Sequence, residues 1–205
     1  MPVVIVDYDV GNLRSVQKGF ERVGAAASIS RDAEEIASAP ALVLPGVGAF
    51  TECMNNLRRY GLLEAVRDYL GSGRPFLGIC VGYQLLFEES EEFGRSEGLG
   101  VLKGRCVKFP FPAGVGMKIP HMGWNEACFQ KKSRLFDGVP DKSDFYFVHS
   151  YYPVPDEDIV VSTTEYGETF ASSVEKGNVF ATQFHPEKSQ RMGLRVLENF
   201  AKISE

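Results

Sequence analysis

The chain has 205 residues, of which 44% are hydrophobic and 24% are charged, so we expect one domain, residues 1–205, with a sizeable core. Its formal net charge of −5, without a basic run, argues against nucleic acid as a partner. No apolar stretch approaches the roughly 20 residues that span a bilayer, and the apolar N-terminus is too short for a signal peptide, so we expect a cytoplasmic protein with no membrane partner.

The first half of the chain alternates strand and helix patterns. Apolar, partly β-branched runs predict strands at residues 3–6, 26–30, 41–44 and 74–79. Apolar residues at helical spacing predict helices at residues 13–23, 51–59, 62–70 and 81–89. Strands separated by helices indicate βαβ units. The expected fold is therefore a three-layer α/β fold, with a mostly parallel central sheet and helices on both of its faces.

The second half of the chain is rich in strand patterns. Strands are predicted at residues 101–109, 144–154, 159–164, 170–174 and 178–183. Turn signals between several of them, such as Tyr166-Gly167 and Lys176-Gly177, favour an antiparallel extension of the sheet. A final helix is predicted at residues 190–203, and the Pro- and Gly-rich segment 109–116 is expected to be a loop.

The segment GICVG at residues 78–82 lies where a predicted strand ends and a helix begins. Its spacing is that of a nucleophile elbow with Cys80 in place of serine. The start of the following helix favours a thiolate, and the amide of Val81 is well placed to bind an oxyanion. The sequence therefore predicts Cys80 as a nucleophile.

The other three cysteines lack this context. Cys53, Cys106 and Cys128 form no CxxC pair and no Cys/His pattern with metal-ligand spacing. We expect them to be free thiols with no role beyond packing. No metal and no cofactor is expected.

A catalytic thiol needs a general base, and the chain has three histidines. Only His185 is followed two residues later by an acid, Glu187. Residues i and i+2 of an extended segment face the same way, so Glu187 can orient the ring of His185 as the third member of a triad. His121 and His149 are interpreted as structural or as part of a binding wall.

The segment PGVG at residues 45–48 ends an apolar strand. Ligands of doubly wound sheets bind beyond the carboxyl ends of the strands, so this loop and Cys80 can share one crevice. Gly46 and Gly48 allow the backbone to turn an amide toward a substrate oxygen. The loop is therefore a candidate second oxyanion element.

The segments at residues 45–48, 78–86 and 185–187 (HPE) together resemble in order and spacing the triad-type (class I) glutamine amidotransferases. Five further segments resemble the glutaminase subunits of imidazole glycerol phosphate synthases: residues 7–13, 87–90, 120–125, 147–151 and 186–189. The HMGWN sequence at residues 121–125 is the most specific of these. The resemblance extends from residue 3 to about residue 200.

The resemblance implies that glutamine is hydrolysed to glutamate and ammonia through a thioester on Cys80. It implies an oxyanion site made by the amide of Val81 and, after a peptide flip, that of Val47 or Gly48. The glutamine-binding residues that it implies are Gly48, Gln84, Glu92, Ser150 and Tyr151.

The resemblance also implies a heterodimer with a (β/α)₈-barrel cyclase, which uses the ammonia in histidine biosynthesis. The residues expected to face this cyclase are Asn12, Trp124, Tyr146 and Lys188. Three residues depart from the family pattern: Asp9 lies where a small residue is common, and Val81 and Tyr83 replace the usual Leu and Met.

Two alternatives are open. One is another glutaminase, such as the subunit of pyridoxal phosphate synthase, or a γ-glutamyl hydrolase; residues 121–125 argue against both. The other is a thiol-based redox or binding module that would use Cys80 without His185.

Overall fold

A nine-stranded sheet organises the computed structural model, which describes residues 2–111 and 117–203. Its strands, in spatial order, are β2 (Ala27–Ser30), β1 (Val3–Val6), β3 (Ala41–Gly46), β4 (Phe76–Cys80), β13 (Val179–Thr182), β12 (Glu168–Lys176), β11 (Val160–Tyr166), β8 (His121–Phe129) and β9 (Ser143–His149). The strands from β2 to β13 pair in parallel, and those from β13 to β9 pair antiparallel. The predicted parallel sheet with an antiparallel extension is therefore confirmed.

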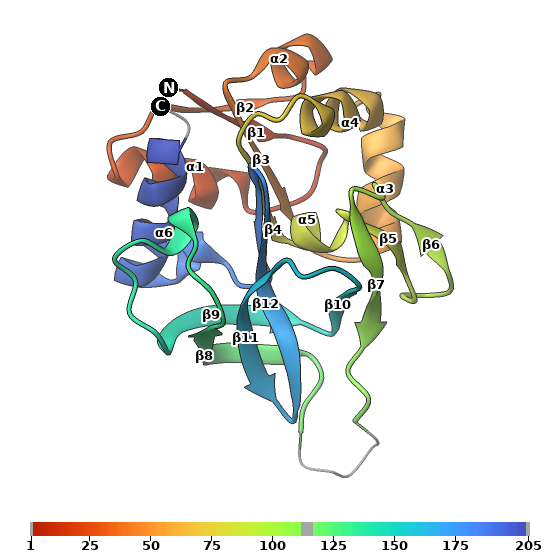
Figure 1. Cartoon of the computed structure of the whole chain (residues 1–205). Helices are drawn as coiled ribbons and strands as arrows, with labels where there is room; N and C mark the ends of the chain where they lie inside the picture. The colour runs from red at the N-terminus through yellow and green to blue at the C-terminus, as the bar shows by residue number, and fades with distance from the viewer. Residues whose placement is uncertain (1, 112–116, 204–205) are drawn as a thin grey trace.

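Helices cover both faces of the parallel strands. Figure 1 shows α1 (Leu13–Arg22) and α6 (Gln190–Ile203) on one side, and α3 (Phe50–Arg59) and α4 (Leu63–Gly71) on the other. The buried face of α1 includes Phe20, whose ring lies 6.1 Å from that of Phe200 in α6. Two short 3₁₀ helices, η1 (Arg134–Phe136) and η2 (Pro186–Lys188), also pack against α6.

The helix predicted at residues 81–89 is wrong. Helix α5 covers only Val81–Gln84, and a strand, β5 (Phe87–Ser90), follows it. Leu85, Leu86 and Phe87 are all fully buried, and an apolar run that is buried on every side has no period that separates helix from strand.

Strand β5 belongs to a second sheet that the sequence did not predict. Its order is β10 (Tyr151–Pro155), β7 (Leu102–Lys108), β5 and β6 (Ser96–Glu97). The strand predicted at residues 144–154 is therefore two strands, β9 and β10, which lie in different sheets on either side of Ser150. This junction borders the site described below.

Strand β8 was not predicted either, and two further differences are smaller. Helix α2 (Ala33–Ser38) was not predicted; it is short, and the side chain of Asp32 caps it by accepting from two backbone amides. Strand β3 was predicted to end at residue 44, but it continues through Pro45 to Gly46. Proline has no N–H to donate, and none is needed at residue 45, because the neighbouring strand β1 pairs with β3 only as far as Val43. In the predicted loop 109–116, residues 112–116 lie outside the described residues.

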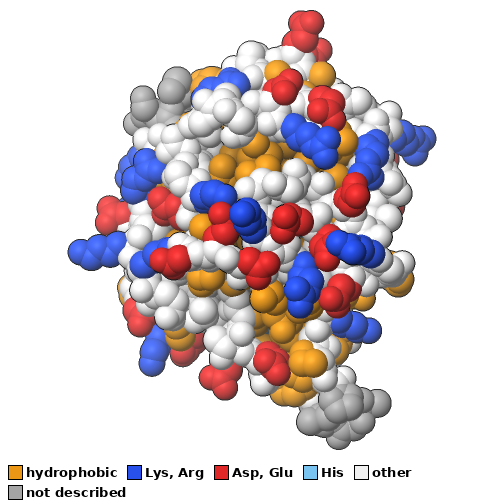
Figure 2. Space-filling view, turned by 45° about the vertical axis from the view of Figure 1, so that its right-hand side comes forward, with side chains coloured by type: hydrophobic (Ala, Val, Ile, Leu, Met, Phe, Trp, Pro, Cys, Tyr) orange, Lys and Arg blue, Asp and Glu red, His pale blue; other side chains and the backbone are white. Residues whose placement is uncertain are grey.

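Charged side chains of both signs are interspersed over the face of the molecule seen in Figure 2. Within residues 2–111 and 117–203, no helix combines the length and the apolar character needed to cross a membrane.

Candidate active site

Cys80 is the last residue of β4 and has φ 56° and ψ −110°, a conformation that is strained for any residue other than glycine. The flanking glycines make this turn possible. A Cβ on Gly82 would lie 1.8 Å from the carbonyl oxygen of Leu44, and one on Gly78 would lie 2.8 Å from the carbonyl oxygen of Gly82. The strand–turn–helix geometry predicted for this segment is present, but the helix has a single turn, so its dipole is weaker than that of the nine-residue helix predicted.

His185 and Glu187 form a buried pair. The Nδ1 atom of His185 lies 2.8 Å from Oε1 of Glu187, and the two side chains are 2% and 1% exposed. The Nε2 atom of His185 is buried and has no hydrogen-bond partner among the described residues. Burial opposes protonation of this ring, but the Cys80 sulfur and the Glu187 carboxylate outweigh it and raise the pKa of His185 to about 10. The ring is therefore a strong enough base to accept the proton of the neighbouring thiol.

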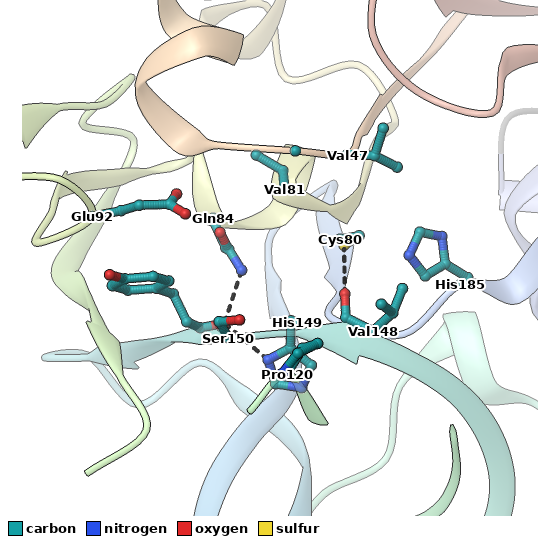
Figure 3. A pocket seen from close by; sticks show the side chains of 12 residues that line it. Val47, Cys80, Val81, Gln84, Glu92, Pro120, Val148, His149, Ser150 and His185 are labelled. Atoms are coloured by element: carbon teal, nitrogen blue, oxygen red, sulfur yellow. Dashed lines mark hydrogen bonds between the residues drawn. The ribbon is translucent and has the colours of Figure 1, made fainter. Parts of the chain in front are cut away.

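A cavity of about 220 Å³ brings most of the predicted residues together. Figure 3 shows Cys80 within it, with the His185 ring beside the sulfur and Val47 and Val81 on the opposite wall from Val148. The residues that line the cavity are Val47, Gly48, Cys80, Val81, Gln84, Glu92, Pro120, Val148, His149, Ser150, Tyr151 and His185. Every predicted oxyanion and glutamine-binding residue is among them, while Glu187 is in contact with the ring of His185 and does not line the cavity.

The loop that carries Val47 is held by two side chains that the sequence did not predict. The phenol of Tyr8 donates to the carbonyl of Pro45 at 2.6 Å, and the thiol of Cys53 donates to the carbonyl of Val47 at 3.5 Å. A trans peptide has its C=O and N–H on opposite sides, so the second bond turns the amide of Gly48 away from Cys53. Cys53 was expected only to pack, and the structure gives it this bond as well.

Gln84 is buried rather than exposed on its helix. Its Nε2 atom donates to the carbonyl of Tyr151 at 2.9 Å and to Oε1 of Gln183 at 3.1 Å. The amide of Gln183 in turn donates to the Cys80 sulfur at 3.8 Å. The sequence prediction missed Gln183, although it lies two residues before His185, a spacing that places both side chains on the same side of an extended segment.

Glu92 has one carboxylate oxygen in use. Its Oε2 atom accepts from the amide of Phe50 at 2.7 Å, which fixes the side chain at the cavity wall. Figure 3 shows Glu92 on the far side of Gln84 from Cys80. Pro120 and Val148 also line the cavity and were not predicted to do so. His149, which was interpreted as structural or as part of a binding wall, lines the cavity as well.

Three of the four predicted partner-facing residues form a cluster at the surface that does not line the cavity; Trp124 and Lys188 are exposed and Tyr146 is partly exposed. Trp124 and Tyr146 are register partners on β8 and β9, with ring centroids 6.1 Å apart, and Trp124 is 48% exposed. The Nζ atom of Lys188 lies 5.8 Å from the centroid of the Tyr146 ring. Asn12 is exposed at the start of α1, and within the described residues no hydrogen bond or ring contact joins its side chain to this cluster.

The protein is thus an α/β protein with one cavity that is lined by a cysteine at a strand-to-helix turn and by a histidine whose ring is paired with a glutamate. The family model for class I glutamine amidotransferases matches residues 4–203, so the chain belongs to that family. Within the class, the chain is similar over nearly its whole length to the HisH subunits of imidazole glycerol phosphate synthases, and it is a member of this group.

The chain is 54% identical to the HisH subunit of Syntrophotalea carbinolica over 98% of this chain and 100% of the relative. It is 51% identical to that of Moorella thermoacetica over 98% and 95%. It is 50% identical to that of Aquifex aeolicus over 100% and 98%. The family expected from the segment at residues 121–125 is therefore confirmed.

Solved structures agree on the fold. A putative GMP synthase subunit from Thermoplasma acidophilum matches with a TM-score of 0.73 and 21% identity, over 100% of this chain and 94% of that one. PurLQS from Thermotoga maritima matches with a TM-score of 0.73 and 19% identity, over 98% and 97%. At these identities the likeness extends to the fold alone.

Proposed function

We propose that this chain is the glutaminase subunit of an imidazole glycerol phosphate synthase, in which Cys80, His185 and Glu187 hydrolyse glutamine. The observation that carries the proposal is the buried His185–Glu187 pair beside a sulfur held in a strained elbow at the cavity. The proposal also includes a single domain over residues 1–205. A cytoplasmic location is supported by cysteines that are all free, as in a reducing compartment.

The chemistry begins with Cys80. Its proton passes to Nε2 of His185, and the sulfur then forms a bond to the side-chain carbonyl carbon of glutamine. The carbonyl electron pair moves to oxygen, and the oxyanion accepts from the amide of Val81 and from that of Val47 or Gly48. When the oxyanion collapses, the C–N bond breaks and His185 gives its proton to the leaving nitrogen, which departs as ammonia.

The thioester is then hydrolysed. His185 takes a proton from water, the oxygen attacks the thioester carbon, and glutamate leaves as the proton returns to the Cys80 sulfur. Glu187 holds Nδ1 of the ring throughout, so that Nε2 faces the sulfur.

Substrate binding uses the wall opposite the elbow. Oε1 of Glu92 is proposed to pair with the α-ammonium of glutamine, since its other oxygen holds the Phe50 amide. The backbone near Ser150 and Tyr151 would hold the α-carboxylate. Both amide hydrogens of Gln84 are already donated to protein atoms, so only its Oε1 is available to the substrate.

The ammonia acceptor is proposed to be a (β/α)₈-barrel cyclase that docks on the face bearing Trp124, Tyr146 and Lys188, with Asn12 at its edge. Trp and Tyr are favoured at interface cores, and Trp124 is exposed in the isolated chain. We expect Trp124→Ala to weaken cyclase binding, measured by calorimetry, and to leave the fold intact.

The deciding experiment is Cys80→Ala in the complex with the cyclase. We expect synthesis from glutamine to be lost and synthesis from added ammonia to remain. Loss of both would mean that Cys80 is structural, and retention of both would place the chemistry elsewhere. Wild-type glutaminase activity is expected to be weak alone and to rise with cyclase and its nucleotide substrate; full activity in isolation would refute this coupling.

A further inference from the structure

Two buried histidines lie in contact beside the cavity. His121 and His149 are register partners on β8 and β9, and they are 3% and 6% exposed. Nδ1 of His121 lies 3.0 Å from Nε2 of His149. Only His149 borders the cavity, so His121 supports it from behind. The proposed chemistry uses neither ring.

One end of this contact fixes the protons of His149. Its Nδ1 atom lies 2.8 Å from the carbonyl oxygen of Tyr151. A carbonyl oxygen only accepts, so Nδ1 carries the hydrogen and donates it. In the neutral ring, Nε2 is then an acceptor, and His121 must donate to it.

The other end of the contact gives the same answer independently. Oδ1 of Asn125 accepts from the amide of Glu126 at 2.9 Å, which sets the orientation of the Asn125 amide. Its Nδ2 atom donates to the carbonyl of Glu165 at 2.9 Å and lies 3.2 Å from Nε2 of His121. Nε2 of His121 is therefore an acceptor, and the hydrogen of this ring is on Nδ1, facing His149. A single arrangement of protons therefore satisfies every hydrogen bond in the series from Asn125 through His121 and His149 to the Tyr151 carbonyl.

The surroundings keep both rings neutral and in place. Burial lowers the pKa of His121 to about 4 and that of His149 to about 3. The His121 ring is stacked on Tyr166 with centroids 4.0 Å apart, and Phe170 lies 5.0 Å from the His149 ring. A second proton on His121 would sit on Nε2 and face the amide nitrogen of Asn125, which is a donor and cannot accept it.

The chain of bonds ends at the point where the two sheets meet. The carbonyl of Tyr151 accepts from His149 on one side and from Gln84 on the other, which occupies both of its lone pairs. Ser150 lies between β9 and β10, Tyr151 is the first residue of β10, and both residues line the cavity. The carbonyl of Ser150 accepts from the amide of Phe109, next to the pairing of β10 with β7, whereas the carbonyl of Tyr151 is held by the two side chains.

We propose that His149 is a positioning residue for glutamine, which holds the Ser150–Tyr151 backbone through the Tyr151 carbonyl, and that His121 and Asn125 fix the tautomer in which it does so. This inference rests on the proposed function, because it assigns a further residue to the same site. It concerns binding of the ground-state substrate rather than the chemical step.

The test compares His149→Asn with His149→Leu in the complex with the cyclase. The amide nitrogen of asparagine can take the place of Nδ1 and donate to the Tyr151 carbonyl, whereas leucine cannot. Loss of one buried hydrogen bond predicts a rise of roughly tenfold in the KM for glutamine in the leucine variant, with kcat changed by less than about threefold. In the asparagine variant the KM is expected to stay within about threefold of the wild type, since the donor is retained.

Asn199→Leu is the matched control. Asn199 is also buried, and it donates to the carbonyls of Leu135 and Asp137; none of these three residues lines the cavity. We expect this variant to melt at a lower temperature but to keep the wild-type KM. The inference is overturned if both His149 variants raise KM equally, or if they lower kcat and leave KM unchanged.

A second measurement does not depend on the variants folding. In wild-type protein labelled with ¹⁵N-histidine, NMR is expected to show His121 and His149 neutral and protonated on Nδ1 at neutral pH. Protonation of His149 on Nε2 would overturn the inference. Failure of the proposed function is seen separately, as a wild-type complex that makes no product from glutamine.

Discussion

The Glu187→Gln substitution tests the proposed triad most directly. It keeps the shape of the side chain and one acceptor oxygen, but it removes the negative charge 2.8 Å from Nδ1 of His185. The new amide group would also lie where Oε2 of Glu187 now has no partner among the described residues, so a buried donor would be left unsatisfied.

The size of the effect follows from this geometry. With side chains 2% and 1% exposed, the His185–Glu187 bond is charge-assisted and shielded from water. Such a bond is worth about 1.5–3 kcal/mol, which converts to a loss of roughly 10- to 150-fold in kcat/KM. The loss is expected in kcat, because the charge stabilises the imidazolium that forms as the thiolate is generated.

The assay is glutamate release by the complex, with ammonia-dependent synthesis as the second readout. Glu198→Gln is the matched control, since Glu198 pairs with Arg195 and Lys202 on the surface, where an ion pair is worth little. We expect the control to behave like the wild type and Glu187→Gln to keep ammonia-dependent synthesis. Retention of half or more of kcat/KM by Glu187→Gln would refute the role of Glu187.

Three other perturbations have defined outcomes. A glutamine-like electrophile is expected to form its adduct on Cys80 alone, because the cavity reaches that sulfur; mass spectrometry that maps the adduct to another cysteine would exclude Cys80 as the nucleophile. Gly82→Ala is expected to disrupt the elbow and lower the melting temperature, since its Cβ would lie 1.8 Å from a backbone oxygen. The control, Gly71→Ala, whose Cβ would have nothing within 4 Å, is expected to leave the melting temperature unchanged or higher. Equal melting temperatures of the two variants would contradict the clash. Burial lowers the pKa of His121 to about 4 and that of His149 to about 3, so below about pH 6.5 these two rings bind more protons in the unfolded chain than in the folded chain. The free energy of unfolding is therefore expected to decrease as the pH is lowered, by up to about 1.4 kcal/mol per pH unit for each ring. Urea titrations between about pH 6.5 and 4 that show no such decrease would contradict the two buried neutral rings.

The parallel half of the fold could be predicted because its signals are local. Most strands there are short apolar runs, such as β1, β3 and β4, and most of the helices carry a clear apolar stripe, as in α1 and α6. At residues 85–87 the prediction was wrong because every side chain is buried, so the sequence has no apolar period that separates helix from strand. Helix α2 was missed because it is short and its main signal is the N-cap residue Asp32. Strand β8 was missed because its interior glycine and mixed polarity give no clean alternation.

The site divides in the same way. The elbow around Cys80 and the pairing of His185 with Glu187 depend on residues close in sequence, so both could be predicted. The His121–His149 contact depends on the register of two strands and joins residues 28 positions apart, which no local pattern encodes. The Gln183–Cys80 contact spans 103 positions and is equally invisible to local reasoning, although the spacing of Gln183 from His185 was a usable signal.

Strand β8 connects these two kinds of residue. Alternate side chains of a strand face opposite sides, and on β8 the exposed residues Met122 and Trp124 alternate with His121 and Asn125 of the hydrogen-bond chain. A partner that docks on the outer side chains therefore acts on the same backbone that fixes the His149 tautomer from within. Because the chain of bonds accepts only one arrangement of protons, a displacement of β8 cannot be absorbed by a change of donor and acceptor. We expect such a displacement to stretch or break a bond of this hydrogen-bond chain. The proposed interface and the hydrogen bonds beside the cavity thus lie on opposite sides of one strand.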